Sequence, residues 1–342
     1  MSRRTRTRSS DRSSRSGSSS RSGRSRSGSG SGSGAETPGA VEVPRTPAAK
    51  APDGTGHDEL RDLAVGIAQQ AAGLVRRLRV DGVSVAATKT SDIDIVTEAD
   101  RASEAHVRDL LARLRPDDAV VGEEDDERPG TSGVRWVLDP VDGTVNFFYG
   151  IPEYAVSLAV QVAEGPVGSG GPASAVEPAE YRTVAGAVVN IATGSVHEAY
   201  LDGGARRDGV PLQVRETVPL AQRLVRTGFS YDAAQRERQA QALVALLPRV
   251  RDVRRMGSCA LDLCAVAAGE ADAYVEEGTH LWDHAAGLLV ASEAGARAEL
   301  LPGAGGRDLV LCGPADGFDE LLAAVRDAGY LATDAAASPT GE

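Results

Sequence analysis

The chain has 342 residues and a formal net charge of -12. Residues 1–34 contain nine Arg and one Asp, so this segment carries +8 and the remainder carries -20. An acidic body repels nucleic-acid phosphates and attracts divalent cations, which argues against phosphate-backbone binding by the folded part and favours metal chemistry.

Membrane and export signals are missing from the sequence pattern. No run approaches the roughly 20 apolar residues that a membrane-spanning helix needs, and the N-terminus lacks the hydrophobic core of a secretory signal. The three cysteines, Cys259, Cys264 and Cys312, lie among apolar or small residues, which predicts reduced thiols and no disulfide framework. We therefore expect a cytoplasmic protein with no membrane partner.

The N-terminal residues 1–34 are almost entirely Arg, Ser and Gly, and the following stretch to residue 56 contains four prolines. Such a composition cannot bury enough apolar surface to order the backbone, so we expect residues 1–56 to be a disordered tail and linker. Nucleic acid is expected as a partner only through this Arg-rich tail. Residues 332–342 are expected to form a flexible C-terminus.

The first half of the folded part is expected at residues 57–205. Apolar residues over 60–80 follow the i, i+3, i+4 spacing of an amphipathic helix. A second helix is expected over 97–114, with Thr97 as its cap and Asp100 three residues later. Short apolar runs at 119–122, 134–138, 155–162 and 184–190 predict strands. The Gly- and Pro-rich stretch 164–180 is interpreted as a hairpin loop.

The second half is expected at residues 206–331, where strands and helices alternate. Strands are expected near 223–227 and 271–276, and helices over 233–247, 260–268, 283–294 and 317–328. This order of elements predicts an α+β fold in packed layers.

Four acidic segments place carboxylates where strands end or turns begin: TSDIDIVTEAD (90–100), VGEED (121–125), WVLDPVDGTVNF (136–147) and LWDHAAG (281–287). In the third, an apolar strand delivers Asp139 into a turn at Pro140, so Asp139 and Asp142 can face one cavity. Free N–H groups of Gly143 and Thr144 would form a phosphate cradle beside them. A lone DxxD is as readily explained by an ordinary Asx turn.

Two further carboxylates support the metal interpretation. Glu123 leaves an apolar strand through a glycine turn, and Asp283 precedes an apolar helix, where a simple N-cap is the alternative. Oxygen ligands without nearby Cys or paired His select Mg²⁺, with Mn²⁺ as an alternative, over zinc. His280 is interpreted as a pocket wall. A pair of such ions can clamp the attacking and leaving oxygens of a phosphoryl displacement.

In this order, the four segments resemble the signature set of the inositol monophosphatase family over about residues 57–331, and DPVDGTVNF and WDHAAGLLVASEAGA carry most of the likeness. The resemblance implies a layered αβαβα sandwich of the inositol monophosphatase and fructose-1,6-bisphosphatase type. It also implies a Mg²⁺-dependent, lithium-sensitive phosphatase for small phosphate monoesters, without a covalent phosphoenzyme. The family is often homodimeric.

The resemblance further implies about two to three Mg²⁺ ions. One is held by Glu123, Asp139 and the backbone carbonyl of Val141; a second by Asp139, Asp142 and Asp283; and Glu123 also positions a weaker third. Asp94 and Thr144 would orient the nucleophilic water. The implied substrate contacts are Asp142, Gly143, Thr144, Gly257, Ser258, Cys259, Glu276 and Asp283.

The substrate itself is not fixed by these motifs. Glu276 matches an acidic residue that binds inositol hydroxyls in the family, and a carboxylate there equally accepts the amine of an amino alcohol such as histidinol phosphate. A histidinol-phosphate phosphatase, or another sugar or nucleotide (bis)phosphatase, is therefore the alternative to an inositol monophosphatase. From another class, the chain could be an RNA- or protein-binding module tethered by its Arg/Ser tail.

Overall fold

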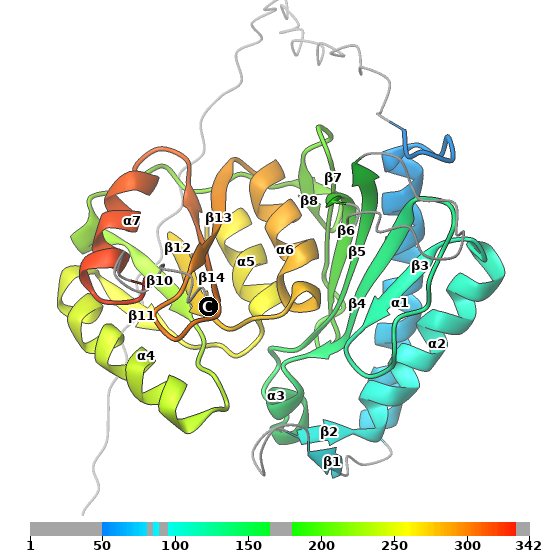
Figure 1. Ribbon diagram of the computed structural model, residues 1–342, viewed down its shortest axis with the longest axis horizontal. Coiled ribbons are helices and arrows are strands. Elements are labelled where there is room, and N and C mark those ends of the chain that lie inside the picture. Colours follow the sequence, from blue (N-terminus) through cyan, green and yellow to red (C-terminus); the bar gives the residue numbers. More distant parts are fainter. Residues whose placement is uncertain (1–49, 81–84, 89–94, 165–179, 333–342) are drawn as a thin grey trace, which may run out of the picture. The chain divides into compact units, whose positions relative to one another are not determined.

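The computed structural model describes residues 50–80, 85–88, 95–164 and 180–332, all of which belong to one compact unit of the chain, residues 45–342 (Figure 1). The expectations for the Arg/Ser tail, the C-terminus, most of the 164–180 loop and Asp94 lie outside the described residues. The last residues of the expected linker, 50–56, are ordered instead: Ala51 is buried against the core and its N–H donates to the Thr55 carbonyl at 2.8 Å.

The helices begin and end close to the expected positions. They are α1 (His57–Val80), α2 (Glu98–Leu114), α3 (Thr144–Tyr149), α4 (Ala233–Leu246), α5 (Cys259–Ala267), α6 (Leu281–Glu293) and α7 (Phe318–Asp327). The cap expected for the second helix is confirmed: Thr97 Oγ1 accepts from the Ala99 N–H at 3.2 Å, and Asp100 accepts from the Thr97 N–H at 3.0 Å. Among the described residues, no helix is both long and apolar enough to cross a bilayer.

The strands of the described residues form three sheets. They are β1 (Val85–Thr88), β2 (Ile95–Thr97), β3 (Ala119–Gly122), β4 (Val134–Asp142), β5 (Ala155–Glu164), β6 (Glu180–Asn190), β7 (Val196–Tyr200), β8 (Ala205–Arg207), β9 (Val210–Pro211), β10 (Leu224–Thr227), β11 (Asp252–Arg254), β12 (Ala273–Glu277), β13 (Ala296–Pro302) and β14 (Asp308–Pro314). Strands β1 and β2 form a small antiparallel pair.

The two large sheets differ in their strand directions. The seven-stranded sheet has the order β3-β4-β5-β6-β7-β8-β9; among these described strands the β3/β4 pair is parallel and the other pairs are antiparallel. The five-stranded sheet has the order β11-β10-β12-β14-β13, with parallel β11/β10 and β10/β12 pairs and antiparallel pairs beyond them. Strands β5 and β6 pair antiparallel up to Glu164 and Glu180.

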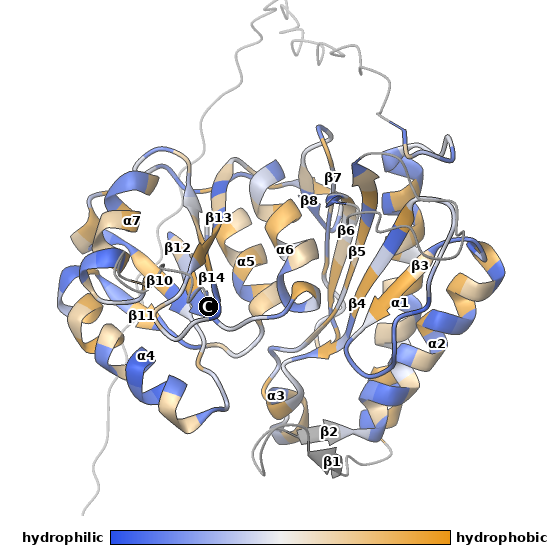
Figure 2. Ribbon diagram, viewed as in Figure 1, coloured by the Kyte–Doolittle hydropathy of each residue, from blue (hydrophilic) through white to orange (hydrophobic). Residues whose placement is uncertain are grey.

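Helices and sheets alternate in five layers. Helices α1 and α2 cover one face of the seven-stranded sheet, α5 and α6 lie between the two sheets, and α4 and α7 cover the outer face of the five-stranded sheet (Figure 1). Colouring by hydropathy shows apolar strands and helices whose polar residues face outward (Figure 2). The predicted αβαβα sandwich is therefore confirmed.

Each layer boundary holds its own core, because side chains alternate across a strand. In β4, Trp136 and Leu138 face α1 and α2, whereas Val137 faces α5 and α6. In β12, Tyr274 joins the middle core and Val275 the outer one.

Small residues let the middle helices approach the seven-stranded sheet closely. A Cβ added to Gly186 in β6 would lie 3.2 Å from both Cα and Cβ of Ala286 in α6. This close contact places the start of α6, which carries Asp283, beside the end of β4, which carries Asp142.

Candidate functional site

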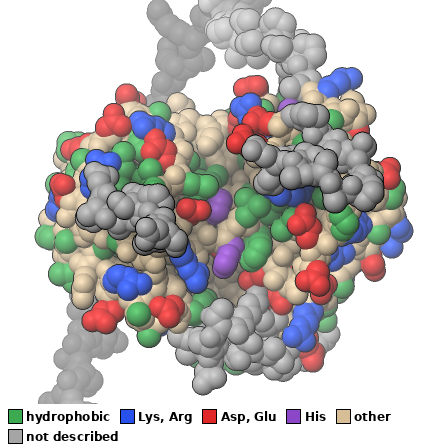
Figure 3. All heavy atoms as spheres, viewed as in Figure 1, with side chains coloured by type: hydrophobic (Ala, Val, Ile, Leu, Met, Phe, Trp, Pro, Cys, Tyr) green, Lys and Arg blue, Asp and Glu red, His purple; other side chains and the backbone are tan. Residues whose placement is uncertain are grey.

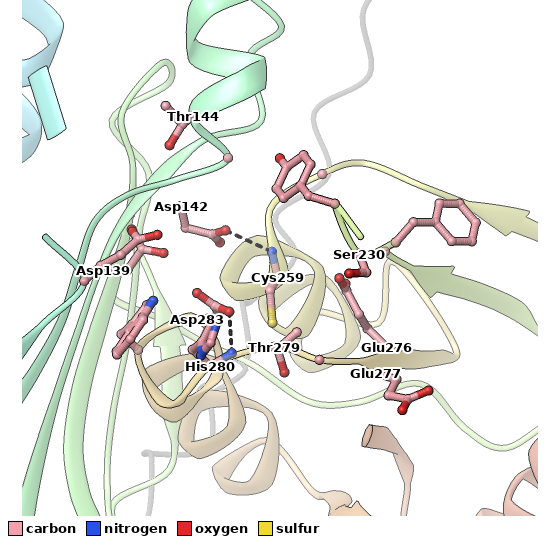
Figure 4. A pocket seen from close by; sticks show the side chains of 18 of the residues that line it. Asp139, Asp142, Thr144, Ser230, Cys259, Glu276, Glu277, Thr279, His280 and Asp283 are labelled. Atoms are coloured by element: carbon pink, nitrogen blue, oxygen red, sulfur yellow. Dashed lines mark hydrogen bonds between the residues drawn. The ribbon is translucent and has the colours of Figure 1, made fainter. Parts of the chain in front are cut away.

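A cavity of about 580 Å³ opens where the end of β4 meets α5, α6 and the five-stranded sheet (Figure 4). Most of the residues expected at the site line it: Glu123, Asp139, Val141, Asp142, Gly143, Thr144, Gly257, Cys259, Glu276 and Asp283. Asp139, Asp142 and Asp283 gather on one side of the cavity, and Glu276 lies across from them (Figure 4). Residues from both large sheets therefore meet in one cavity.

The parallel pairing of β3 with β4 explains why Glu123 lies beside Asp139. Gly122 pairs with Leu138, and the residues after this pair leave the same edge of the sheet. The sequence predicted that the chain turns at Pro140, but β4 continues to Asp142 with an irregularity in its pairing with β5. Asp139 accepts a hydrogen bond from the Val141 N–H at 2.9 Å across this irregularity, which fixes the side chain locally.

The chain turns instead at Gly143, whose left-handed backbone (φ 92°) favours glycine. A Cβ there would lie 2.8 Å from the carbonyl oxygen of Glu153. Helix α3 begins at the next residue, Thr144. Its Oγ1 lies 2.9 Å from an Asp100 carboxylate oxygen and 3.0 Å from the Val141 carbonyl oxygen, so its single proton is donated to one of them at a time.

Asp100 contacts the cavity residue Thr144, a contact that the sequence did not predict. Its expected capping role is real, but the same carboxylate also reaches Thr144, 44 positions away in the sequence. No local pattern could have revealed that contact, because the capping box already explains an Asp at this position. Asp94, which the resemblance assigned beside Thr144, lies outside the described residues.

Asp142 joins the N-terminal part of the fold to α5. Its carboxylate accepts hydrogen bonds from Ser258 Oγ at 2.5 Å, the Ala260 N–H at 2.7 Å and the Cys259 N–H at 3.2 Å. Burial raises the pKa of Asp142 to about 6, against the lowering effect of these hydrogen bonds. Ser258, expected to line the pocket, is buried and is not among the residues that line the cavity.

Cys259 presents a thiol to the cavity. Burial, followed by the charges of Asp142 and Glu276, raises the pKa of this thiol well above its usual range. The protonated thiol is a poor nucleophile at neutral pH.

Asp283 lies in the first turn of α6 and lines the cavity. The N-cap of α6 is His280, so the N-cap alternative for Asp283 is wrong: Asp283 is the N3 residue, and its carboxylate accepts from the His280 N–H at 2.6 Å. Burial, then the charges of Asp142 and Glu123, raise the pKa of Asp283 well above its usual range. His280 also lines the cavity, as expected, with its ring stacked on Trp282 at 4.8 Å between centroids.

Glu276 lies on the opposite wall. The buried Tyr274 hydroxyl donates to Glu276 Oε2 at 2.7 Å, and Gly228 packs against the same carboxylate. Burial raises the pKa of Glu276, while the Tyr274 hydrogen bond and the charge of Arg255 lower it. Arg255 and Arg307 bring positive charge to this otherwise acidic cavity.

Other lining residues were not anticipated, chiefly the loop 228–233 after β10, together with Arg255, Thr279 and Arg307. A Gly-Phe-Ser-Tyr loop carries no local signal for a pocket wall. Its place at the cavity follows from β10 lying next to β12 in the five-stranded sheet.

The donor chemistry of the cavity fits divalent cations. Glu123, Asp139, Asp142 and Asp283 offer hard oxygen ligands in one space, and the mutual repulsion that raises the Asp283 pKa is relieved by positive charge. As they stand, no three His, Cys, Asp or Glu side chains among the described residues are grouped closely enough to hold an ion. Asp142 and Asp283 are turned toward the starts of α5 and α6.

Comparison with known proteins gives a consistent result. Residues 57–170 and 175–329 match the inositol monophosphatase family. The inositol-1-monophosphatase SuhB of Mycobacterium tuberculosis (strain ATCC 25618 / H37Rv) is 45% identical over 287 residues, covering 78% of this chain and 93% of that protein. The solved structure of Mycobacterium tuberculosis SuhB superposes with a TM-score of 0.65 at 42% identity, covering 80% of this chain and 98% of the other.

A more distant relative carries another name. The Nus factor SuhB of Escherichia coli (strain K12) is 33% identical over 236 residues, covering 68% of this chain and 82% of that protein.

Proposed function

Because the chain belongs to the inositol monophosphatase family and is a phosphoric monoester hydrolase, we propose that it hydrolyses inositol monophosphate to inositol and phosphate with Mg²⁺ as cofactor. The observation that carries this proposal is the convergence of Glu123, Asp139, Asp142 and Asp283 on one cavity that also presents Thr144 and Glu276. The first four would bind metal and phosphate, and the last would bind the polyol.

The metal ligands proposed are Glu123, Asp139, Asp142, Asp283 and the Val141 carbonyl. Mg²⁺ held there would neutralise the phosphate charge and lower the pKa of the attacking water. When Thr144 donates its proton to Asp100, the lone pairs of its hydroxyl oxygen are left to orient that water, and the Val141 carbonyl is left without that hydrogen bond. In hydrolysis, the water oxygen forms a P–O bond, the P–O bond to the inositol oxygen breaks, and the proton lost by the water protonates the leaving inositol oxygen.

Within an otherwise acidic cavity, the Arg255 charge that acts on Glu276 favours a polyol over an amino alcohol. Arg255 lines the same cavity and its charge acts on the Glu276 carboxylate. An ammonium group bound to Glu276 would be repelled by that positive charge, whereas a neutral hydroxyl in the same place would not be repelled. Tyr274 already occupies one carboxylate oxygen, which leaves the other for a donor hydroxyl. This supports inositol monophosphate over histidinol phosphate.

A substrate panel tests the proposal. Phosphate release would be measured from inositol 1-phosphate, histidinol phosphate and fructose 1,6-bisphosphate, each with Mg²⁺ and with EDTA. We expect the highest kcat/KM for inositol 1-phosphate, activity only with Mg²⁺, and inhibition by lithium. A preference for histidinol phosphate would overturn the substrate assignment, and undiminished turnover in EDTA would overturn the cofactor.

The family resemblance also supports a homodimer acting in the cytoplasm. Sedimentation equilibrium of the full chain should give twice the mass of one chain, and a monomer at micromolar concentration would contradict the dimer.

A second candidate function comes from the relatives named Nus factor SuhB and from the nine Arg residues of the first 34. In this alternative the chain binds RNA through its tail. On the face shown in Figure 3, acidic and basic side chains of the described residues are interspersed, which does not favour a phosphate backbone there. RNA retention by the full chain, lost on removal of residues 1–34, would support the alternative; retention without the tail would exclude tail-mediated binding.

A further inference from the structure

One face of α2 presents three buried polar side chains toward the candidate site. Asp100, Ser103 and Glu104 are spaced i, i+3, i+4, and each is 0% exposed. Asp100 contacts Thr144, and Ser103 Oγ donates to the Pro140 carbonyl at 3.1 Å, between Asp139 and Val141. Each therefore holds a segment that carries site residues.

Glu104 holds the turn after β3. Its carboxylate accepts from the Glu124 N–H at 3.0 Å and from the Asp125 N–H at 3.1 Å, the two peptide groups that follow Glu123. The guanidinium of Arg108, one helical turn later, pairs with the same carboxylate at 2.8 Å. Arg108 also donates to the Asp125 carbonyl at 3.0 Å, so Glu104 and Arg108 together bind both N–H groups and a carbonyl group of the turn.

Gly122 explains how the carboxylate comes so close. A Cβ at this position would lie 2.1 Å from Glu104 Oε1, a separation that no side chain tolerates without movement. The glycine before Glu123 is therefore needed for the packing of Glu104, in addition to any role in the turn.

We infer that Glu104 is the positioning residue for Glu123: by binding two consecutive peptide N–H groups, its buried carboxylate fixes the direction in which the Glu123 side chain leaves the turn. A charged acceptor held by an ion pair makes strong hydrogen bonds in a buried place, so the turn is ordered before an ion arrives. The inference rests on the proposed function, in which Glu123 is a Mg²⁺ ligand.

The test is the Mg²⁺ affinity of the Glu104→Gln variant. The amide keeps the shape of the side chain but can accept with only one oxygen, so one of the two N–H groups loses its partner. Loss of a group that orients a metal ligand typically weakens binding about 10- to 100-fold. We expect the Mg²⁺ Kd, measured by calorimetry on the full chain with Mg²⁺ alone, to rise by about that factor, while KM for inositol 1-phosphate at saturating Mg²⁺ stays within about twofold.

Asp118→Asn is the matched control. Asp118 is likewise buried and multiply hydrogen-bonded, but it precedes β3, whereas Glu123 follows it. This variant should lose thermal stability and keep the wild-type Mg²⁺ Kd. In the Gly122→Ala variant the added methyl group would push the Glu104 carboxylate away from the turn. This variant should therefore weaken Mg²⁺ binding as Glu104→Gln does.

The outcomes separate the inference from the function on which it rests. A wild-type chain that binds no Mg²⁺ overturns both. A wild-type chain that binds Mg²⁺, together with a folded Glu104→Gln variant of unchanged Kd, overturns only the positioning role. An equal loss of Mg²⁺ affinity in Asp118→Asn, or failure of both Glu104→Gln and Gly122→Ala to fold, would also overturn it, because Glu104 would then serve only general stability.

Discussion

The carboxylate of Glu276 is held between Tyr274 and Gly228, and the Gly228→Ala variant tests whether that placement sets substrate binding. A Cβ at residue 228 would lie 1.8 Å from Glu276 Oε2 and 2.2 Å from its carboxyl carbon. The backbone of Gly228 does not have positive φ, so the added methyl strains the packing and leaves the backbone conformation allowed. The change therefore acts on Glu276.

The size of the effect follows from the required movement. Cβ contacts shorter than 3.0 Å essentially never occur, so the carboxylate must shift by about 1 Å or more. A hydrogen bond of 2.7 Å to Tyr274 does not survive such a shift, nor would one to a substrate hydroxyl. A hydrogen bond to a charged group contributes about 1.5–3 kcal/mol, which corresponds to roughly a 10- to 150-fold rise in KM for inositol 1-phosphate.

The assay is steady-state phosphate release at saturating Mg²⁺, with the Mg²⁺ Kd measured separately. Tyr274→Phe removes the hydroxyl on the other side of Glu276 and should raise KM in the same direction. Gly66→Ala in α1, where an added Cβ meets nothing within 4 Å, is the control and should leave KM unchanged. An unchanged KM in a folded Gly228→Ala protein would refute the role of Glu276 in substrate binding.

Two further predictions concern stability. Asp118→Ala removes the acceptor shared by Arg115, Ser132 and the Trp136 indole N–H, and should lower the free energy of unfolding by about 3–5 kcal/mol in chemical denaturation; a loss below about 1 kcal/mol would contradict this account of the network. Burial, followed by the charge of Arg207, lowers the pKa of His197 from 6.5 to about 4, so the folded protein keeps this ring neutral while the unfolded chain takes up a proton. The contribution of His197 to the free energy of unfolding is therefore fully present above pH 6.5. It decreases as the pH drops toward 4, by at most about 3 kcal/mol. His197→Gln should flatten the decline of Tm between pH 6.5 and 4.5, and an identical decline in both proteins would contradict the assignment.

Much of the fold could be predicted because local patterns agree with the final structure. The periodicity of α1, the capping box of α2 and the apolar runs of β3 to β6 are all properties of short segments. The short strands β7 to β9 and the β13/β14 pair were not anticipated. Strand β13 contains exposed and partly buried residues without a buried face, and β9 is only two residues long. Neither strand therefore gives a clear alternation of apolar and polar residues in the sequence.

The candidate site was predictable in its carboxylates and less so in its contacts. Asp139, Asp142 and Asp283 lie in distinctive motifs, whereas the second role of Asp100 and the support from Glu104 depend on which face of α2 packs against the ends of β3 and β4. Arg255 and the loop 228–233 reach the cavity only through the order of strands in the five-stranded sheet. Such contacts depend on topology, which a single segment does not encode.

The proposed action of these carboxylates through Mg²⁺ in phosphate monoester hydrolysis is tested most directly by the Asp139→Asn variant. Asp139 lines the cavity, and its local hydrogen bond from the Val141 N–H at 2.9 Å can also be accepted by an Asn side chain, so the variant should fold. We predict that phosphate release from inositol 1-phosphate at saturating Mg²⁺ falls by at least about 100-fold. Wild-type turnover by a folded Asp139→Asn protein, or by the wild-type chain stripped of divalent cations, would contradict the account.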